Sequence, residues 1–118
     1  MPKTGAGKIG ERFAAEYLRQ KGYAIVAMNF RSRFGEIDII AQNGRYIAFV
    51  EVKTRAAESL THPFAAITPA KRMRIVKTAQ YYLQGHPTQR QPRFDAAAIF
   101  MRADTPERIE YLENVFWK

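Results

Sequence analysis

Two apolar segments on either side of an Asn-Gly dipeptide constrain this chain more than any other feature. Residues 36–42 and 45–53 are rich in isoleucine, valine and phenylalanine, which are typical of buried β-strands. Asn43-Gly44 between them is the strongest short-range sequence signal for a β-hairpin. A two-residue turn there pairs Gln42 with Arg45 and so predicts the register of both strands.

The predicted register places charged side chains relative to one another. It sets Asp38 opposite Phe49 and Glu51 opposite Glu36. Asp38 and Glu51 are then diagonal neighbours, roughly 7–8 Å apart at the backbone. Because side chains alternate with period two, these four residues and Lys53 share one face. A four-residue loop preserves this shared face, whereas a three-residue loop shifts the register by one and breaks it.

Carboxylates within apolar strands are costly unless they are paired or bind a metal. The tips of Asp38 and Glu51 can converge on one hard divalent cation, Mg²⁺ or Mn²⁺, which needs few carboxylates and keeps several waters. Lys53 reaches the same region with a charge suited to a phosphate or a water. The alternative is a solvated surface ion pair, since Glu-x-Lys is common on strands. Apolar neighbours such as Val50 and Val52 favour a buried strand, and with it metal-assisted phosphodiester hydrolysis.

Length and composition indicate one soluble domain over residues 1–118, with residues 1–4 expected to be flexible. There is no cysteine, which excludes disulfides and cysteine-based zinc sites. No segment approaches the ~18 apolar residues needed to span a bilayer, so no membrane partner is expected. Residues 1–10 lack the apolar core of a secretory signal. A cytoplasmic location is the resulting expectation.

The net charge of +8, with a pI near 10.0, favours an anionic partner, most often nucleic acid. The alternative is a basic protein with no such partner. Between Glu58 and Asp95 there is no acidic residue, although several cations lie there. A field of one sign over this region attracts phosphates. The candidate nucleic-acid contacts are Arg31, Arg33, Arg55, Lys71, Arg72, Arg74 and Lys77. Four aromatic residues are candidates for stacking on bases, Phe30, Phe34, Tyr81 and Tyr82, of which Tyr82 also belongs to the apolar stripe of its helix and Phe34, in a basic turn, is favoured.

Periodicity and turn residues predict the order α-β-β-β-α-β-β, which indicates a mixed sheet flanked by helices. A first helix ends near Gly22, and a second begins after the N-cap Thr68 and ends at Gly85. Outside the hairpin, strands are predicted at residues 23–29, 94–101 and 109–116, with a loop over residues 56–67. Glu11 borders the apolar stripe of the first helix. There its carboxylate either reaches a metal site or interacts favourably with the positive end of the helix dipole.

Several short motifs together resemble the YraN family of proposed endonucleases. The motifs are Gly10-Glu11, Asn29-Phe30-Arg31, Gly35-Glu36-Ile37-Asp38, Phe49-Val50-Glu51-Val52-Lys53-Thr54-Arg55, Lys71 and Arg93-Phe94-Asp95. Their order and spacing hold over nearly the whole chain, and the combination is specific although no single motif is. That family is similar to archaeal Holliday junction resolvases and other PD-(D/E)xK nucleases.

The resemblance implies a restriction-endonuclease-like αβββαβ core and a metal-dependent endonuclease acting on DNA, including branched or flapped structures. It implies that Asp38, Glu51 and Glu11 are metal ligands, and that Lys53 orients or helps to deprotonate the attacking water. Ile37 stands where the motif name has proline. The resemblance also suggests a homodimer. The alternative is a non-catalytic nucleic-acid-binding module on the same fold.

Overall fold

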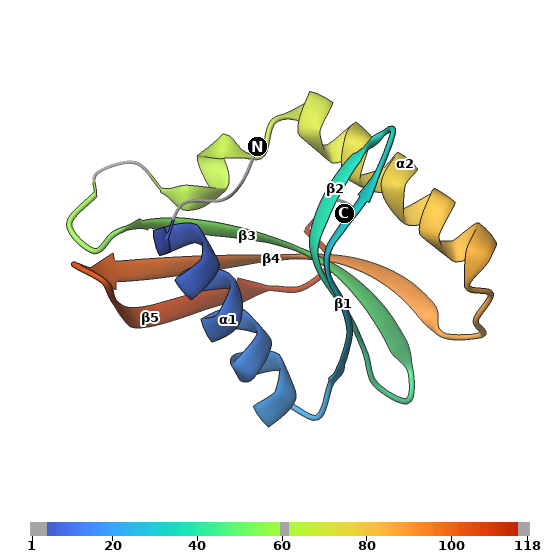
Figure 1. Ribbon diagram of the computed structural model, residues 1–118, viewed down its shortest axis with the longest axis horizontal. Coiled ribbons are helices and arrows are strands. Elements are labelled where there is room, and N and C mark those ends of the chain that lie inside the picture. The colour runs from blue at the N-terminus through green and yellow to red at the C-terminus, as the bar shows by residue number, and fades with distance from the viewer. Residues whose placement is uncertain (1–4, 60–61, 116–118) are drawn as a thin grey trace.

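The computed structural model describes residues 5–59 and 62–115, and within them the chain follows the predicted order of elements (Figure 1). The elements are α1 (Gly5–Gln20), β1 (Ala24–Ser32), β2 (Gly35–Gln42), β3 (Tyr46–Ala56), the short 3₁₀ helix η1 (Pro63–Ala66), α2 (Pro69–Gly85), β4 (Gln91–Arg102) and β5 (Thr105–Leu112). Residues 1–4, expected to be flexible, lie outside the described residues. Neither α-helix of the described ranges is long and apolar enough to cross a membrane.

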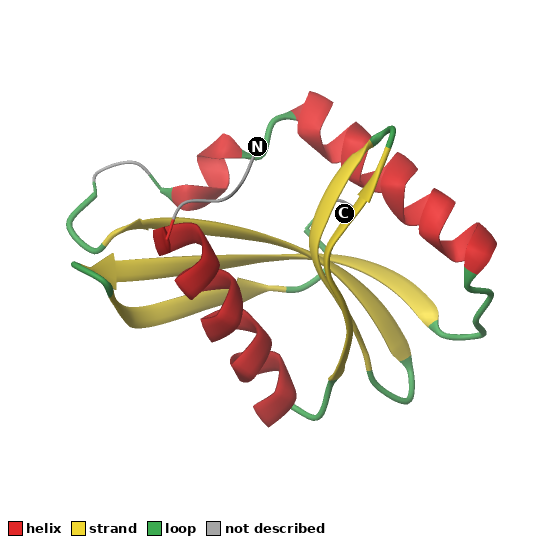
Figure 2. Cartoon of the chain, in the orientation of Figure 1, coloured by secondary structure: helices red, strands yellow, loops and turns green. Residues whose placement is uncertain are grey.

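The strands form one sheet in the order β1-β2-β3-β4-β5. Every neighbouring pair is antiparallel except β3 and β4, which are parallel and are joined through η1 and α2. Figure 2 shows the sheet between the two α-helices. The predicted fold class, a mixed sheet flanked by helices, is therefore confirmed, and it is consistent with an αβββαβ nuclease-like core.

Each face of the sheet has its own apolar core, because successive residues of a strand point to opposite sides. The cluster on the α1 side includes Ala14, Leu18, Ile39, Val50 and Ile99. The cluster on the α2 side includes Ile40, Ile47, Phe49, Ile75 and Tyr82. Full burial of each large apolar side chain contributes about 1.5–3 kcal/mol, so both helices are held firmly against β2 and β3.

The hairpin register differs from the prediction by two positions. Gln42 lies opposite Ile47 rather than opposite Arg45. The last paired residues of the ladder are Ile39 and Val50, so the next position in the same register sets Asp38 directly across from Glu51. Because the shift is by an even number of residues, Asp38 and Glu51 still lie on the same face of the sheet, as predicted. They are directly opposite each other, and so closer than in the predicted diagonal arrangement.

The side chain of Asn43 explains the shifted turn. Its Oδ1 accepts hydrogen bonds from the backbone N–H groups of Arg45 and Tyr46, at 2.9 and 2.7 Å. The turn is therefore centred on Gly44 and Arg45, one residue later than predicted. A type I′ turn centred on Asn43-Gly44 requires positive φ at both residues, and neither has it.

Several strand boundaries also differ from the prediction. β3 continues to Ala56 and β4 begins at Gln91, each three residues beyond the predicted bound. β1 continues to Ser32, so the turn before β2 contains only residues 33–34. β5 spans Thr105–Leu112 rather than residues 109–116, and residue 116 lies outside the described residues. The start of β5 is polar and contains Pro106, a pattern typical of loops, but it pairs with β4 as an exposed edge strand, where proline is tolerated.

Candidate metal and nucleic-acid site

A hollow of about 250 Å³ opens on the α2 side of the sheet, between the start of β2, the middle of β3 and the first turns of α2. Its lining residues are Gly35, Glu36, Asp38, Glu51, Lys53, Lys71, Arg74 and Ile75. The structure thus brings together Asp38, Glu51 and Lys53, as the hairpin pattern predicts. It also adds two cations from a helix that is distant in sequence.

Asp38 is only 3% exposed, and its position is fixed by the backbone of the neighbouring strand. The N–H of Val52 donates a hydrogen bond of 2.8 Å to Oδ2 of Asp38. This contact lies just beyond the last backbone pair of β2 and β3. The carboxylate therefore accepts a strand N–H where the paired ladder ends, which holds one of its oxygens in place.

Glu51 lies between a negative and a positive neighbour. Burial, the charge of Asp38 and a hydrogen bond between the two carboxyl groups raise the pKa of Glu51 to about 7, although Lys53 acts in the opposite direction. Nζ of Lys53 lies 3.2 Å from Oε2 of Glu51. Because two adjacent buried carboxylates repel each other when both are ionised, the pair favours binding a proton or a cation.

The donor set of this pair fits a hard divalent cation. Magnesium is commonly held by one or two carboxylates, with waters and substrate phosphate oxygens completing its coordination. Asp38 and Glu51 supply two such carboxylates at the edge of an open hollow. Within residues 5–59 and 62–115, no three histidine, aspartate or glutamate side chains form a metal-binding group. The carboxylate pair is therefore the candidate site, with the remaining ligands to come from water and substrate.

Three cations, Lys53, Lys71 and Arg74, line the same hollow. The charge of Lys53 and partial burial lower the pKa of Lys71, and Arg74 adds to this effect. Cations close enough to perturb one another are stabilised by an anion between them. The local start of α2 positions this cluster, because Oγ1 of Thr68 caps the helix by accepting the N–H of Lys71 at 3.3 Å.

Glu11 lines a different hollow from the one that Asp38 and Glu51 line. It is 4% exposed, accepts a hydrogen bond of 3.0 Å from Nδ2 of Asn29, and lines a second hollow of about 580 Å³. Lys53 lines both hollows, so the two adjoin across β3. A role for Glu11 as a metal ligand stays a prediction. Sequence reasoning did not single out Asn29 as its partner, although a strand asparagine tolerates the positive φ of 52° seen there.

The predicted nucleic-acid contacts divide between two regions. Arg55 lines the second hollow, where its Nη1 donates to the carbonyl of Thr54 at 2.9 Å. The others lie along α2 and the β1–β2 turn. Arg31 pairs with Glu36 at 3.1 Å, and Arg33 lies over the ring of Phe34. On α2, Lys71 is half-buried, while the exposed cations are Arg72, Arg74 and Lys77.

Comparison with known proteins places the chain in a family. The model of the family described as "Uncharacterised protein family UPF0102" matches residues 10–99, which include both hollows' acidic residues and the cations of α2. This chain is a member of the UPF0102 family. The match spans the sheet from β1 to most of β4, together with both α-helices apart from the start of α1.

Individual relatives support the same assignment over nearly the full chain. A UPF0102 protein of Syntrophus aciditrophicus is 46% identical, over 93% of this chain and 87% of the relative. One from Chlorobium limicola is 44% identical over 95% and 92% of the two chains. One from Caldanaerobacter subterraneus subsp. tengcongensis is 40% identical over 97% and 96%. The likeness therefore covers the whole fold of this UPF0102 protein.

Proposed function

We propose that this UPF0102 protein is a metal-dependent endonuclease that hydrolyses DNA phosphodiester bonds, including those of branched or flapped structures. The supporting observation is the adjacent Asp38–Glu51 pair, with Lys53 on Glu51 and a hollow that Lys71 and Arg74 complete. The YraN resemblance and the affiliation with PD-(D/E)xK nucleases belong to this proposal, as does a cytoplasmic location.

Each residue of the hollow has a distinct part in the proposal. Asp38 and Glu51 would hold Mg²⁺ or Mn²⁺, which when bound supplies charge neutralisation at the phosphate and lowers the pKa of water. Lys53 is kept beside Glu51 by their 3.2 Å contact and would orient the attacking water or a phosphate oxygen. Lys71 and Arg74 would bind the phosphate oxygens and so position the phosphorus over the carboxylates.

A second candidate function is a nucleic-acid-binding module without catalysis. It is favoured by α2, which carries four cations and no acid and needs no chemistry to bind a phosphate backbone. The buried carboxylates argue for the enzyme, because acids beside a phosphate weaken binding unless a cation lies between them. The two candidates therefore differ in whether the chain cuts DNA, not in whether it binds.

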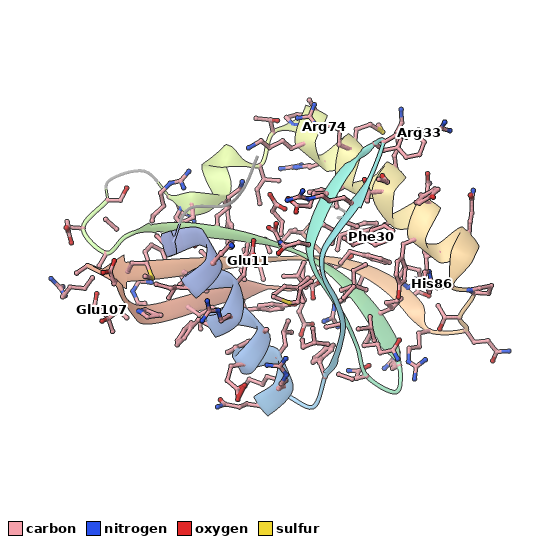
Figure 3. All side chains as sticks on the ribbon, in the orientation of Figure 1. Glu11, Phe30, Arg33, Arg74, His86 and Glu107 are labelled. Carbon is pink, nitrogen blue, oxygen red and sulfur yellow. The ribbon has the colours of Figure 1, made fainter. Side chains whose placement is uncertain are left out.

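The test is cleavage of branched, flapped, single-stranded and linear duplex DNA with Mg²⁺, Mn²⁺ or EDTA. The variant is Asp38→Asn, because an amide oxygen still accepts the N–H of Val52 while the negative charge is lost. The matched control is Glu107→Gln, an exposed carboxylate near the β4–β5 turn, distant from the hollow (Figure 3).

Wild type and the control should cut at least one substrate only with the metal, and Asp38→Asn should cut it about 100-fold or more slowly. Absence of metal-dependent cutting on every substrate, or equal cutting by Asp38→Asn, contradicts the enzyme and leaves the binding module.

We also propose a homodimer. Light scattering tests this, and a mass near 13.6 kDa contradicts it.

A further inference from the structure

Beside the hollow, two neighbouring aromatic rings, one half-buried and one exposed, form a platform. Phe34, from the β1–β2 turn, and Tyr81, from α2, have ring centroids 6.4 Å apart, and Tyr81 is 50% exposed. We call these two residues the aromatic platform. Phe30 lies 6.3 Å from the ring of Tyr81 and 5.1 Å from that of Tyr82, so it links the platform to the core.

The aromatic platform and the hollow lie on one continuous surface. Arg74 and Tyr81 are seven residues apart on α2, which puts them on the same helical face and separates them by about 10 Å along the axis. The turn before β2 crosses this face, since a Cβ atom on Gly35 would lie 3.3 Å from Cβ of Arg74. Figure 3 shows Arg33 and Arg74 near this crossing of hairpin tip and helix.

The surroundings of the aromatic platform are cationic. The guanidinium of Arg33 lies 4.9 Å from the ring centroid of Phe34. Lys77 precedes Tyr81 by one helical turn and is exposed, and α2 contains no acidic residue. An occupant that satisfies both features has a flat ring and a negative charge, as a nucleotide does.

A purely structural role explains Tyr81 poorly. Tyr82 is 9% exposed and belongs to the core beside Phe49, as its place in the apolar stripe predicts. Tyr81 is half exposed instead, and its ring lies against those of Phe30 and Phe34 at the surface and belongs to neither apolar cluster. An exposed aromatic ring within reach of several cations is the arrangement that proteins use to stack on the bases of single-stranded DNA.

We propose that the aromatic platform stacks an unpaired DNA base, while the phosphate to be cut lies in the hollow. The inference rests on the proposed function and specifies its substrate. The axial spacing of about 10 Å corresponds to roughly three stacked nucleotides. A base within an intact duplex is stacked on both sides and is unavailable to protein rings. The substrate therefore contains a single-stranded segment within a few nucleotides of the cut.

The experiment measures DNA binding in EDTA, which prevents cutting. Three DNAs of equal length are compared by fluorescence anisotropy: a duplex with a single-stranded arm, the same molecule with abasic sites in the arm, and a blunt duplex. The variants are Tyr81→Ala and Tyr81→Phe. The matched control is Met73→Ala, an exposed apolar side chain on the same helix that has no ring.

Wild type should bind the armed DNA more tightly than the abasic and blunt forms. Tyr81→Ala should weaken binding to the armed DNA by roughly 5- to 150-fold and leave the other two unchanged, while Tyr81→Phe and Met73→Ala behave as wild type. A 2-aminopurine base in the arm should be quenched by wild type but not by Tyr81→Ala.

An unchanged affinity of Tyr81→Ala for armed DNA, or an equal loss on blunt duplex, overturns the inference. The result is independent of the cleavage assay. Cutting that depends on Asp38 together with no effect of Tyr81 overturns only the inference, whereas stacking without metal-dependent cutting overturns only the enzyme. A wild-type protein that binds none of the three DNAs overturns the inference, and the cleavage assay then decides the enzyme separately.

Discussion

The backbone N–H of Val52 donates a 2.8 Å hydrogen bond to the carboxylate of Asp38, so an acidic side chain accepts a strand N–H where the ladder of β2 and β3 ends. This contact positions one charged group of the candidate site through the sheet itself. It also means that an alanine at position 38 would leave a buried N–H without its acceptor, at a cost of about 1–3 kcal/mol. Asp38→Asn is therefore the better variant, because it removes the negative charge and keeps an oxygen that accepts the N–H of Val52.

The raised pKa of Glu51 predicts a pH-dependent stability in the absence of divalent cations. The folded-state pKa is about 7, above the ordinary value of 4.5, so protonation favours the folded state. The contribution is fully present below pH 4.5 and is lost as the pH rises through about 7. The stability advantage of Glu51→Gln over wild type should therefore grow from near zero at pH 4.5 to about 3 kcal/mol above pH 7.

Urea unfolding of both proteins in EDTA at several pH values measures this difference. Glu107→Gln is the control, because its carboxylate is exposed and distant from the hollow. If the stability difference between Glu51→Gln and wild type is the same at pH 4.5 and pH 8, the pKa of Glu51 is not raised in the folded protein.

Because α1 lies close to β3, we expect Gly10→Ala to destabilise the wild-type protein but not the Thr54→Ala variant. A Cβ atom on Gly10 would collide with Oγ1 of Thr54, so Gly10→Ala should destabilise wild type by about 1–2 kcal/mol. In Thr54→Ala the collision is removed, and the remaining neighbours are at ordinary contact distance. There the same substitution should be neutral or stabilising, because alanine favours a helix.

Thermal or urea unfolding of the four proteins in this cycle gives the coupling between the two positions. Additive effects would mean that α1 does not approach β3 as closely as described. Because Glu11 follows Gly10 directly, the cycle also tests how firmly the second hollow is held.

The cations of α2 predict a salt dependence of DNA binding. If Lys71, Arg72 and Arg74 contact phosphates, replacing all three with glutamine should lower the slope of log affinity against log salt by about 2–3. The matched control removes the same charge from exposed positions on or just after α1, with Arg12, Arg19 and Lys21 changed to glutamine. Equal changes in slope for the two triple variants would indicate a general charge effect and not a contact surface on α2.

The face shared by Asp38, Glu51 and Lys53 was predictable because side chains alternate strictly along a strand. The exact register was not, because it depends on which residue of the turn accepts hydrogen bonds. The Oδ1 of Asn43 takes two backbone N–H groups and moves the centre of the turn by one residue. An Asn-Gly pair thus predicts a hairpin more reliably than it predicts the turn geometry.

The order of elements and the helix ends were also predictable, since Thr68 and Gly85 are strong local signals. Contacts between distant segments were not. The pattern of α2 predicts a basic face, but only the fold shows that Lys71 approaches Lys53 across the hollow. Likewise, the hydrogen bond between Glu11 of α1 and Asn29 of β1 joins residues that are 18 positions apart, and no local pattern indicates it.

Arg93 and Asp95, which belong to one of the short motifs of the sequence, form a buried ion pair on β4. In the structure Arg93 donates to both oxygens of Asp95, and the hydroxyl of Tyr111 donates to Oδ2 at 2.6 Å. Asp95 is fully buried and lines neither of the two hollows described above, so its position suits a role in holding β4 and β5 together.

The most direct test of the central proposal is a calorimetric titration of the metal-free protein with Mn²⁺. If Asp38 and Glu51 hold a divalent cation, wild type and Glu107→Gln should each bind Mn²⁺ at one site, and Asp38→Asn and Glu51→Gln should each weaken binding by at least about tenfold. Equal Mn²⁺ affinity in wild type, Asp38→Asn and Glu51→Gln would contradict the proposed metal site.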